Sequence, residues 1–295
     1  MNRAVRLGSL RSLAFLNRGT KSTASLEQSL LKTSRQYSTS KNPINVGPGF
    51  YNFRGDFKVM MMNIQTQMSL ILLPNGKYLV VDTIELTKDT KKEIDELTDG
   101  GRIIESVIGT HSFHTTHFEA FHKSYPDADY YGTPRHLKNI KKIDWKGDLS
   151  DPSTRRKWNP DVEIRITEGS EFINPYPSNR LSSAWVFHKP SKTIHINDTV
   201  MYAEDPGFLF RMIGVKKQKM TIHPSIHGYG LKDHPEAPFE FRDFVNKAII
   251  DWDFDNMVMA HVDNKLGGAK ELLKETVEEY EPVFKRLHTI KKMIQ

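Results

Sequence analysis

Short apolar runs alternate with helix-forming stretches between residues 77 and 140, and this order limits the folds that the chain can adopt. Residues 77–82, 103–108 and 128–131 have the length and apolar content of strands. Each is followed by a helix-forming stretch, and the first of these covers residues 86–98. Because strands that alternate with helices build layered domains, the sequence predicts an α/β fold.

The second half of the chain adds strands and two long helices. Strands are expected at 162–167, 171–174, 183–188 and 193–198, and helices at 239–251 and from 268 to the C-terminus. Residues 144–160 are expected to form a surface excursion. Residues 223–238, which contain His223, His227 and His234, are expected to form an exposed loop.

The strands at 183–188 and 193–198 meet at a tight hairpin. Pairing across it puts Ile194 and Ile196 on one face, and His188 and His195 on the other. Asp198 has the parity of the two isoleucines, so it should point inward at the strand's end. The two histidines should lie on a half-exposed face, turned away from Asp198.

The chain contains no cysteine, which excludes disulfides, cysteine nucleophiles and thiolate metal sites. A metal ion would therefore have to be held by His, Asp or Glu. No run of 18 or more apolar residues occurs, so no membrane span is expected.

The net positive charge comes from the N-terminus. Residues 1–44 carry eight basic residues against one acidic residue, Glu27, which gives +7 and leaves −1 on the rest of a chain whose formal charge is +6. Since the basic residues gather in a tail and not on a folded face, no nucleic-acid partner is expected.

Residues 1–40 are rich in Arg and Ser and carry spaced apolar residues that suit a basic amphipathic helix. This composition is typical of a mitochondrial transit peptide, and Arg35-Gln36-Tyr37-Ser38 resembles the cleavage context of fungal presequences. We expect mitochondrial import, with the matrix as the destination; the alternative is a basic N-terminus without a targeting role. Residues 41–52 are expected to be a linker and residues 53–295 a single domain.

Three histidines, His111, His114 and His117, come directly after the strand predicted at 103–108. Three imidazoles within seven residues at a strand-to-helix junction can converge on one cation. The alternative is that one or two of them cap the helix and the rest face solvent. Asp198 and His261 each end another predicted strand and are further candidate ligands.

These features resemble the metallo-β-lactamase superfamily over residues 53–287. The resemblance includes the run from Gly76 to Asp82, Thr110-His111 after a strand, Asn197-Asp198-Thr199 after a hairpin, and Ala260-His261 before the last helix. The Thr-His-x-Phe-His stretch and residues 251–261 resemble a fungal branch of it. The resemblance implies a four-layer αββα sandwich with metal ligands at strand ends along one sheet edge. It also implies that Asp82 orients a ligand histidine.

The chain departs from the superfamily's H-x-H-x-D-H motif. Without a gap, Phe113, Thr115 and Thr116 stand where the second His, the Asp and the last His belong. With one inserted residue, His111, His114 and His117 take the three His positions, and Thr116 replaces the Asp. The next ligand His of the superfamily belongs near residues 178–181, where the chain has none.

The leading hypothesis is a mitochondrial metal-dependent hydrolase that acts on an ester, thioester or amide of a small-molecule substrate. His111, His114, Asp198 and His261, with His117 as a further candidate, would hold zinc or iron. The degenerate motif predicts one ion or none in place of two. One alternative is a non-catalytic descendant that binds a small ligand or a protein partner. Another is a mononuclear iron oxygenase, disfavoured because the His expected before Asp198 is missing.

Overall fold

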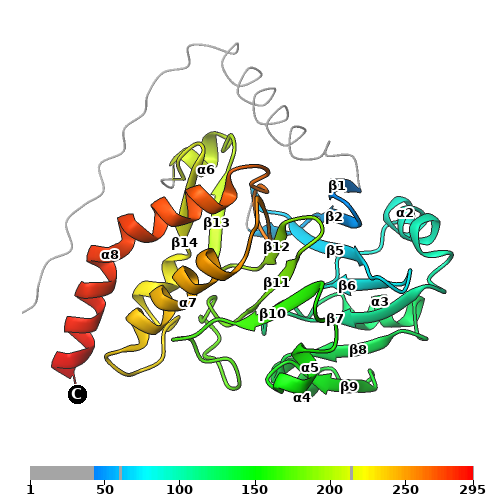
Figure 1. Cartoon of the computed structure of the whole chain (residues 1–295), viewed down its shortest axis with the longest axis horizontal. Coiled ribbons are helices and arrows are strands. Elements are labelled where there is room, and N and C mark those ends of the chain that lie inside the picture. The colour runs from blue at the N-terminus through cyan, green and yellow to red at the C-terminus, as the bar shows by residue number, and fades with distance from the viewer. Residues whose placement is uncertain (1–42, 60–61, 213–214, 295) are drawn as a thin grey trace, which may run out of the picture. The chain divides into compact units, whose positions relative to one another are not determined.

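The structure is a computed structural model, and it describes residues 43–59, 62–212 and 215–294. The predicted transit peptide, residues 1–40, lies outside the described residues. The described residues belong to one unit, 40–295. Labels for its helices and strands follow Figure 1.

A seven-stranded sheet forms the N-terminal half. Its strand order is β1-β2-β5-β6-β7-β8-β9, with antiparallel pairing up to β6 and parallel pairing from β6 to β9. The bounds are β1 Ile44–Gly47, β2 Phe50–Gly55, β5 Thr66–Leu72, β6 Tyr78–Val81, β7 Ile104–Ile108, β8 Asp129–Gly132 and β9 Trp145–Asp148. The parallel part is the βαβα region that the sequence predicted.

A four-stranded sheet, in the order β10-β11-β12-β15, lies against the first. It consists of β10 Val162–Ile166, β11 Ala184–His188, β12 Thr193–Ile196 and β15 Asn256–Met259. The pair β12 and β15 is parallel. Apolar side chains from both sheets, among them Ile71, Ile108, Val186 and Val258, form a shared buried core between them.

Helices cover both outer faces, so the layers are α, β, β and α (Figure 1). Helices α2 Lys88–Thr98, α3 Phe118–Ser124 and α4 Pro134–Asn139 lie on the side of the seven-stranded sheet. Helices α7 Ala237–Asp251 and α8 Ala269–Ile294 cover the four-stranded sheet, where Phe241 and Phe284 are fully buried beside Trp185. A short helix, α5 Pro152–Arg155, precedes β10. This is the four-layer αββα sandwich that was predicted.

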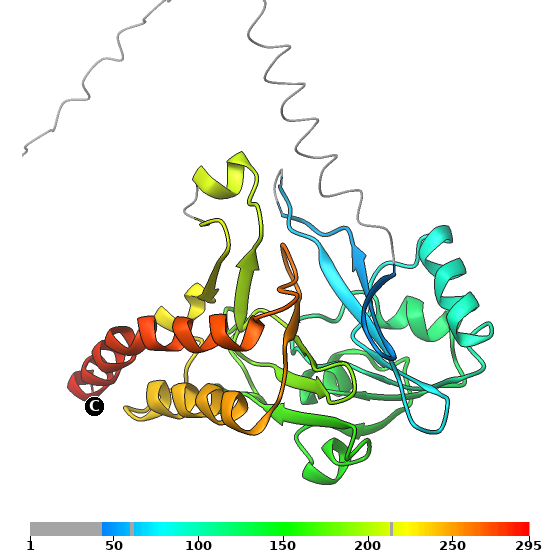
Figure 2. The same ribbon diagram turned by 45° about the horizontal axis from the view of Figure 1, so that its top comes forward.

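Two short hairpins extend from the sandwich on the same side (Figure 2). One is β3 Lys58–Val59 with β4 Met62–Asn63. The other is β13 Val200–Ala203 with β14 Lys219–Ile222, and its connection contains α6 Phe208–Met212. A 3₁₀ turn at Pro224–His227 follows β14.

The sequence misassigned several segments. Residues 44–52, expected to be part of a linker, contain β1 and the start of β2, and Phe50 is fully buried. Residues 171–174 form no strand, whereas β9, β13 and β14 were not predicted. These three strands have only four residues each, so they are too short to give a clear alternation of apolar and polar residues.

The predicted register of the β11–β12 hairpin is confirmed, because Val186 pairs with His195 and Phe187 with Ile194. The expected exposure of its histidines is wrong. His195 is fully buried because its face of the strand packs against the other sheet. The alternation of the strand also does not determine where the Asp198 side chain points, because β12 ends at Ile196 and the backbone of Asp198 has a φ of +46°.

No helix among the described residues is long and apolar enough to cross a membrane.

Candidate metal centre

The candidate ligands gather where parallel strands end. Asp82 follows β6, and His111 and His114 follow β7 in the same sheet. Asp198 and His261 follow β12 and β15, which are parallel neighbours in the other sheet. Since the carboxyl ends of parallel strands meet at one sheet edge, residues far apart in sequence come together here.

Strained backbone marks the same edge. Asp82, Asp198 and Val262, which follows His261, have φ values of +58°, +46° and +67°. A positive φ is uncommon for a residue with a side chain and is least favourable for a β-branched one. Such strain persists only where surrounding contacts hold it, and it clusters at functional sites.

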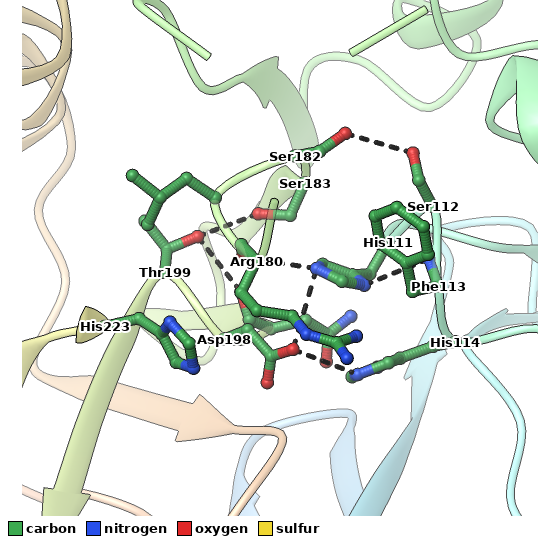
Figure 3. A network of polar contacts seen from close by, with 12 residues as sticks. His111, Ser112, Phe113, His114, Arg180, Ser182, Ser183, Asp198, Thr199 and His223 are labelled. Atoms are coloured by element: carbon green, nitrogen blue, oxygen red, sulfur yellow. Dashed lines mark hydrogen bonds and ion pairs between the residues drawn. The ribbon is translucent and has the colours of Figure 1, made fainter. Parts of the chain in front are cut away.

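Asp198 is the centre of the cluster, and its side chain is only 3% exposed. Its Oδ2 lies 3.4 Å from Nε2 of His114 and 3.7 Å from Nε2 of His111. Ligand atoms of these three residues all lie within 4.8 Å of one another. Figure 3 shows both imidazoles turned toward the Asp198 carboxylate from a separate segment.

His261 approaches the other carboxylate oxygen of Asp198. Its Nε2 lies 3.1 Å from Oδ1, yet this buried oxygen accepts no hydrogen bond among the described residues. Nδ1 of His261 is 2.6 Å from the carbonyl oxygen of Gln65, so it must carry the proton and donate. Nε2 of His261 can then face Oδ1 of Asp198 either as the N–H of an imidazolium or as a ligand of a cation that it shares with the carboxylate.

In His111 the ring proton lies on Nε2 and not on Nδ1 as in His261. Its Nδ1 accepts the backbone N–H of Phe113 at 3.2 Å, so the proton of the neutral ring lies on Nε2. This Nε2–H donates to the carbonyl oxygen of Arg180 at 3.2 Å. Burial and the nearby charge of His114 lower the pKa of His111 to about 3. Neither nitrogen of this neutral ring offers a free lone pair.

His114 and Asp198 form an ion pair in the metal-free protein. Burial alone would lower the pKa of His114, but the charge and hydrogen bonding of Asp198 raise it above the ordinary value. Burial would likewise raise the pKa of Asp198, but His114 and His261 hold it well below its usual range. Asp198 is thus a buried carboxylate that stays charged only because cations adjoin it.

Asp82 holds the segment that carries His111. Its carboxylate accepts the backbone N–H and the hydroxyl of Thr110, at 2.8 and 2.6 Å, and it lies 3.0 Å from Nε2 of His195. Burial opposes ionisation here, but His195 and Thr110 keep the pKa of Asp82 well below its usual range. Asp82 therefore orients His111 through the backbone of Thr110. None of these hydrogen bonds reaches the ring of a candidate ligand.

His136, which the sequence did not single out, supports His114. Its Nδ1 accepts from the backbone N–H of Thr133, so its Nε2–H donates to the carbonyl oxygen of His114 at 3.2 Å. Burial lowers the pKa of His136 to about 4. Two glycines make room for it, since an added Cβ at Gly109 or Gly132 would lie 2.6 or 2.7 Å from His136 atoms.

Arg54 performs a similar role for His261. Its buried guanidinium donates to the carbonyl oxygens of Met259, Ala260 and Val262, the backbone on both sides of His261. Burial lowers the pKa of Arg54 to about 10. A buried cation bound to three carbonyls fixes the strained turn in which His261 lies.

Arg180 occupies the region where the resemblance placed a further ligand histidine. Its carbonyl accepts from His111, and its guanidinium lies 5.4 Å from the centre of the Phe113 ring. The positive charge of Arg180 acts to lower the pKa values of His114 and His223. The guanidinium of Arg180 therefore adds positive charge beside the cluster (Figure 3).

His117 lies outside the cluster of His111, His114 and Asp198. It precedes helix α3 as its N-terminal cap residue, without a capping hydrogen bond from its side chain. It lines a small cavity of about 50 Å³ together with His114 and His261. Its position at the helix start agrees with the alternative from the sequence, in which one or two of the three histidines lie at the start of the helix.

His223 was expected in an exposed loop but is half-buried beside the cluster. Figure 3 shows its ring on the far side of Asp198 from His114. Nδ1 accepts the backbone N–H of Ser225 at 3.1 Å, so Nε2 carries the proton. Burial lowers the pKa of His223, which keeps it a neutral hydrogen-bond donor.

No protein-family model and no curated protein matches the chain. Among solved structures, it is similar to the metallo-β-lactamase VMB-1, at pH 5.5, with a TM-score of 0.54 and 14% identity over 80% of this chain and 94% of that one. The metallo-β-lactamase from Hirschia baltica has a TM-score of 0.54 and 15% identity over 80% of this chain and 96% of that one. The metallo-β-lactamase DIM-1 has a TM-score of 0.54 and 13% identity over 82% of this chain and 97% of that one. The chain has the metallo-β-lactamase fold. Identities this low establish the fold, so the chemistry has to come from the residues of this chain.

The residues at the ligand edge of this metallo-β-lactamase fold fit one divalent cation. Oδ1 of Asp198 accepts no hydrogen bond that meets the usual geometry among the described residues, and Nε2 of His261 lies 3.1 Å from it. The Nδ1–H of His261 is held by a carbonyl, which is the usual arrangement of a metal-binding imidazole. Nitrogen and carboxylate donors of this kind suit zinc and iron.

We predict that His136 makes the metal-free protein lose stability as the pH falls. Its pKa is about 4 in the fold against 6.5 unfolded, so between these values the unfolded chain binds a proton that the folded chain does not. The free energy of unfolding should fall by up to roughly 1.4 kcal/mol per pH unit from this residue alone. Urea unfolding of chelator-treated protein from pH 7 to 4.5 measures the slope.

His136→Gln should flatten that slope by about one proton, whatever it does to the stability at pH 7. The exposed His227 provides the matched control, and His227→Gln should leave the slope unchanged. An unaltered slope in His136→Gln would show that folding does not shift the pKa of His136.

Proposed function

We propose that the protein is a hydrolase with one metal ion, held by His114, Asp198 and His261. The observation that carries this proposal is the buried Oδ1 of Asp198, which faces Nε2 of His261 at 3.1 Å. His111 adjoins the same carboxylate, but both of its nitrogens are engaged with backbone groups. When bound, a divalent cation supplies Lewis-acid chemistry, since it acidifies water and polarises a carbonyl group.

The residues around this position have separate roles. Asp198 and the neutral imidazoles compensate the cation's charge in a buried setting. His136 holds His114 through its backbone carbonyl, and Arg54 holds His261 through the carbonyls of the residues on either side of it. His223 presents an Nε2–H on the other side of Asp198, where it can donate to the carbonyl oxygen of an ester, thioester or amide.

We predict that the purified mature protein binds close to one zinc or iron ion per chain. Asp198→Asn and His261→Gln should each reduce the bound metal at least tenfold, because each removes an acceptor that faces the cation. His111→Asn should retain the ion, since the amide oxygen can still accept from Phe113. Elemental analysis after chelation and reconstitution, with circular dichroism to check folding, measures all three.

The exposed His227 again provides a control, and His227→Asn should bind metal as the wild type does. Two tightly held ions per chain would overturn the single-ion proposal. Loss of the ion from a folded His111→Asn variant would make His111 a ligand.

Two His and one Asp with open positions are also the ligand set of mononuclear iron oxygenases. The proton positions of His111 and His261 favour this second candidate, because they leave His114, His261 and Asp198 as the donors. The identity of the tightly bound metal separates the two functions. Retained iron together with oxygen consumption would support the oxygenase, and retained zinc would support the hydrolase.

We predict metal-dependent hydrolysis of activated acyl substrates. Across a panel of nitrophenyl esters, thioesters and anilides, the zinc-loaded protein should exceed Asp198→Asn at least 100-fold on one class. His223→Phe should lower kcat by roughly 10²-fold, the cost of one oxyanion donor, with metal content unchanged. A loaded protein no faster than Asp198→Asn on every class would favour the non-catalytic alternative, in which the site only binds a ligand or protein partner.

We also propose that residues 1–40 direct the protein to mitochondria. The support is the sequence alone, with eight basic residues and one acid among residues 1–44 and spaced apolar side chains. Residues 1–40 fused to a fluorescent protein should reach the mitochondrial matrix and be cleaved near Tyr37. Replacing the arginines of the segment by glutamine should leave the fusion in the cytosol. Cytosolic fluorescence from the unaltered fusion would refute the proposal.

A further inference from the structure

The β13–β14 hairpin packs against the core and borders a cavity, which residues from both of its faces line. Tyr202 and Met220 pack beneath helix α8 in the same buried cluster as Phe284. Met201 and Thr221, which have the other parity, pair directly across the two strands and line a cavity of about 430 Å³. Volumes of this size, within about 300–1,000 Å³, are typical of small-molecule sites.

Aliphatic side chains complete the walls of this cavity. Ile64 and Val215 pack with the buried Ala203 and Val262 in a small apolar cluster that borders it. Ile64 follows the β3–β4 hairpin, so the cavity lies between the two hairpins that extend from the sandwich (Figure 2). Lys216 and Lys219 also line it, and their stems add apolar surface while their charges can reach solvent.

The inner end of the cavity meets the candidate metal centre. His223 and His261 both line it. His261 also lines the small cavity that contains His114, so its ring stands where the two spaces adjoin. A molecule with its carbonyl beside His114 and His261 can therefore extend an apolar group between Met201 and Val262.

We infer that this cavity binds the acyl chain of the substrate, which makes the substrate an ester or thioester of a medium-chain fatty acid. The inference rests on the proposed hydrolase function only for the reaction at the carbonyl end of the substrate. If a non-hydrogen atom occupies roughly 30 Å³, as a liquid water does, the cavity holds on the order of 14 such atoms. A chain of about ten carbons with its carboxyl group matches this volume. Besides the two histidines, the polar wall residues of the cavity are Lys216, Lys219, Thr221, Tyr202 and Tyr280. Lys219 and Tyr202 are already hydrogen-bonded to Glu279 and Glu204, so the apolar walls suit an acyl chain better than a sugar or a nucleotide.

Binding can be measured without hydrolysis. Decanoate, used as the probe in isothermal titration calorimetry, should bind chelator-treated protein saturably, at one site per chain and in the micromolar range. Thr221→Trp fills the cavity from a strand face that is not packed in the core, and should weaken binding at least tenfold. Lys217→Trp, on the same hairpin but outside the cavity lining, is the matched control and should bind within twofold of wild type. Thermal unfolding confirms that both variants fold.

Hydrolysis gives the second readout. Zinc-loaded protein should show a KM for p-nitrophenyl octanoate at least tenfold below that for the acetate, and Thr221→Trp should remove this difference. Saturable probe binding that Thr221→Trp blocks, without any hydrolysis, would support the acyl site and refute the hydrolase. Equal KM values, or probe binding that Thr221→Trp leaves intact, would overturn the acyl site even if esters are hydrolysed.

Discussion

The buried carboxylate of Asp198 is the constraint on which the site depends. A charge removed from water is costly unless positive partners surround it. Here the partners are His114 and His261, brought from the ends of strands in two different sheets. Their supports, His136 and Arg54, are buried as well, and each acts on a backbone carbonyl. A single anion thus explains why so many polar groups are enclosed at this edge.

The segment before β11 gives His111 partners other than a metal ion. The Nε2–H of His111 donates to the Arg180 carbonyl, and the guanidinium of Arg180 adds positive charge nearby. A cation bound by His111 would have to displace this carbonyl and lie close to that guanidinium. These contacts therefore support the single ion that we propose at His114, Asp198 and His261.

The sequence predicted the fold because the βαβα pattern and the strand-end residues survive in the chain. It placed His114, Asp198 and His261 on converging strand ends, and the structure brings them into contact. It could not place His136, Arg54 or His223, because each acts across a distance in sequence with no local pattern. His195 was misjudged because period-two alternation does not reveal whether the second face meets water or another sheet. The proton positions of His111 depend on Phe113 and Arg180 together, so they needed coordinates.

The segment after β7 also binds the two sheets to each other. Thr110 accepts the backbone N–H of Ala184, and Ser112 donates to the carbonyl of Ser182, which joins the seven-stranded sheet to the start of β11. The site consequently spans the seam of the sandwich, with His114 on one half and Asp198 and His261 on the other. A metal ion bound as proposed would join the two sheets, so its binding should slow amide hydrogen exchange at Ala184, whose N–H donates across the same seam.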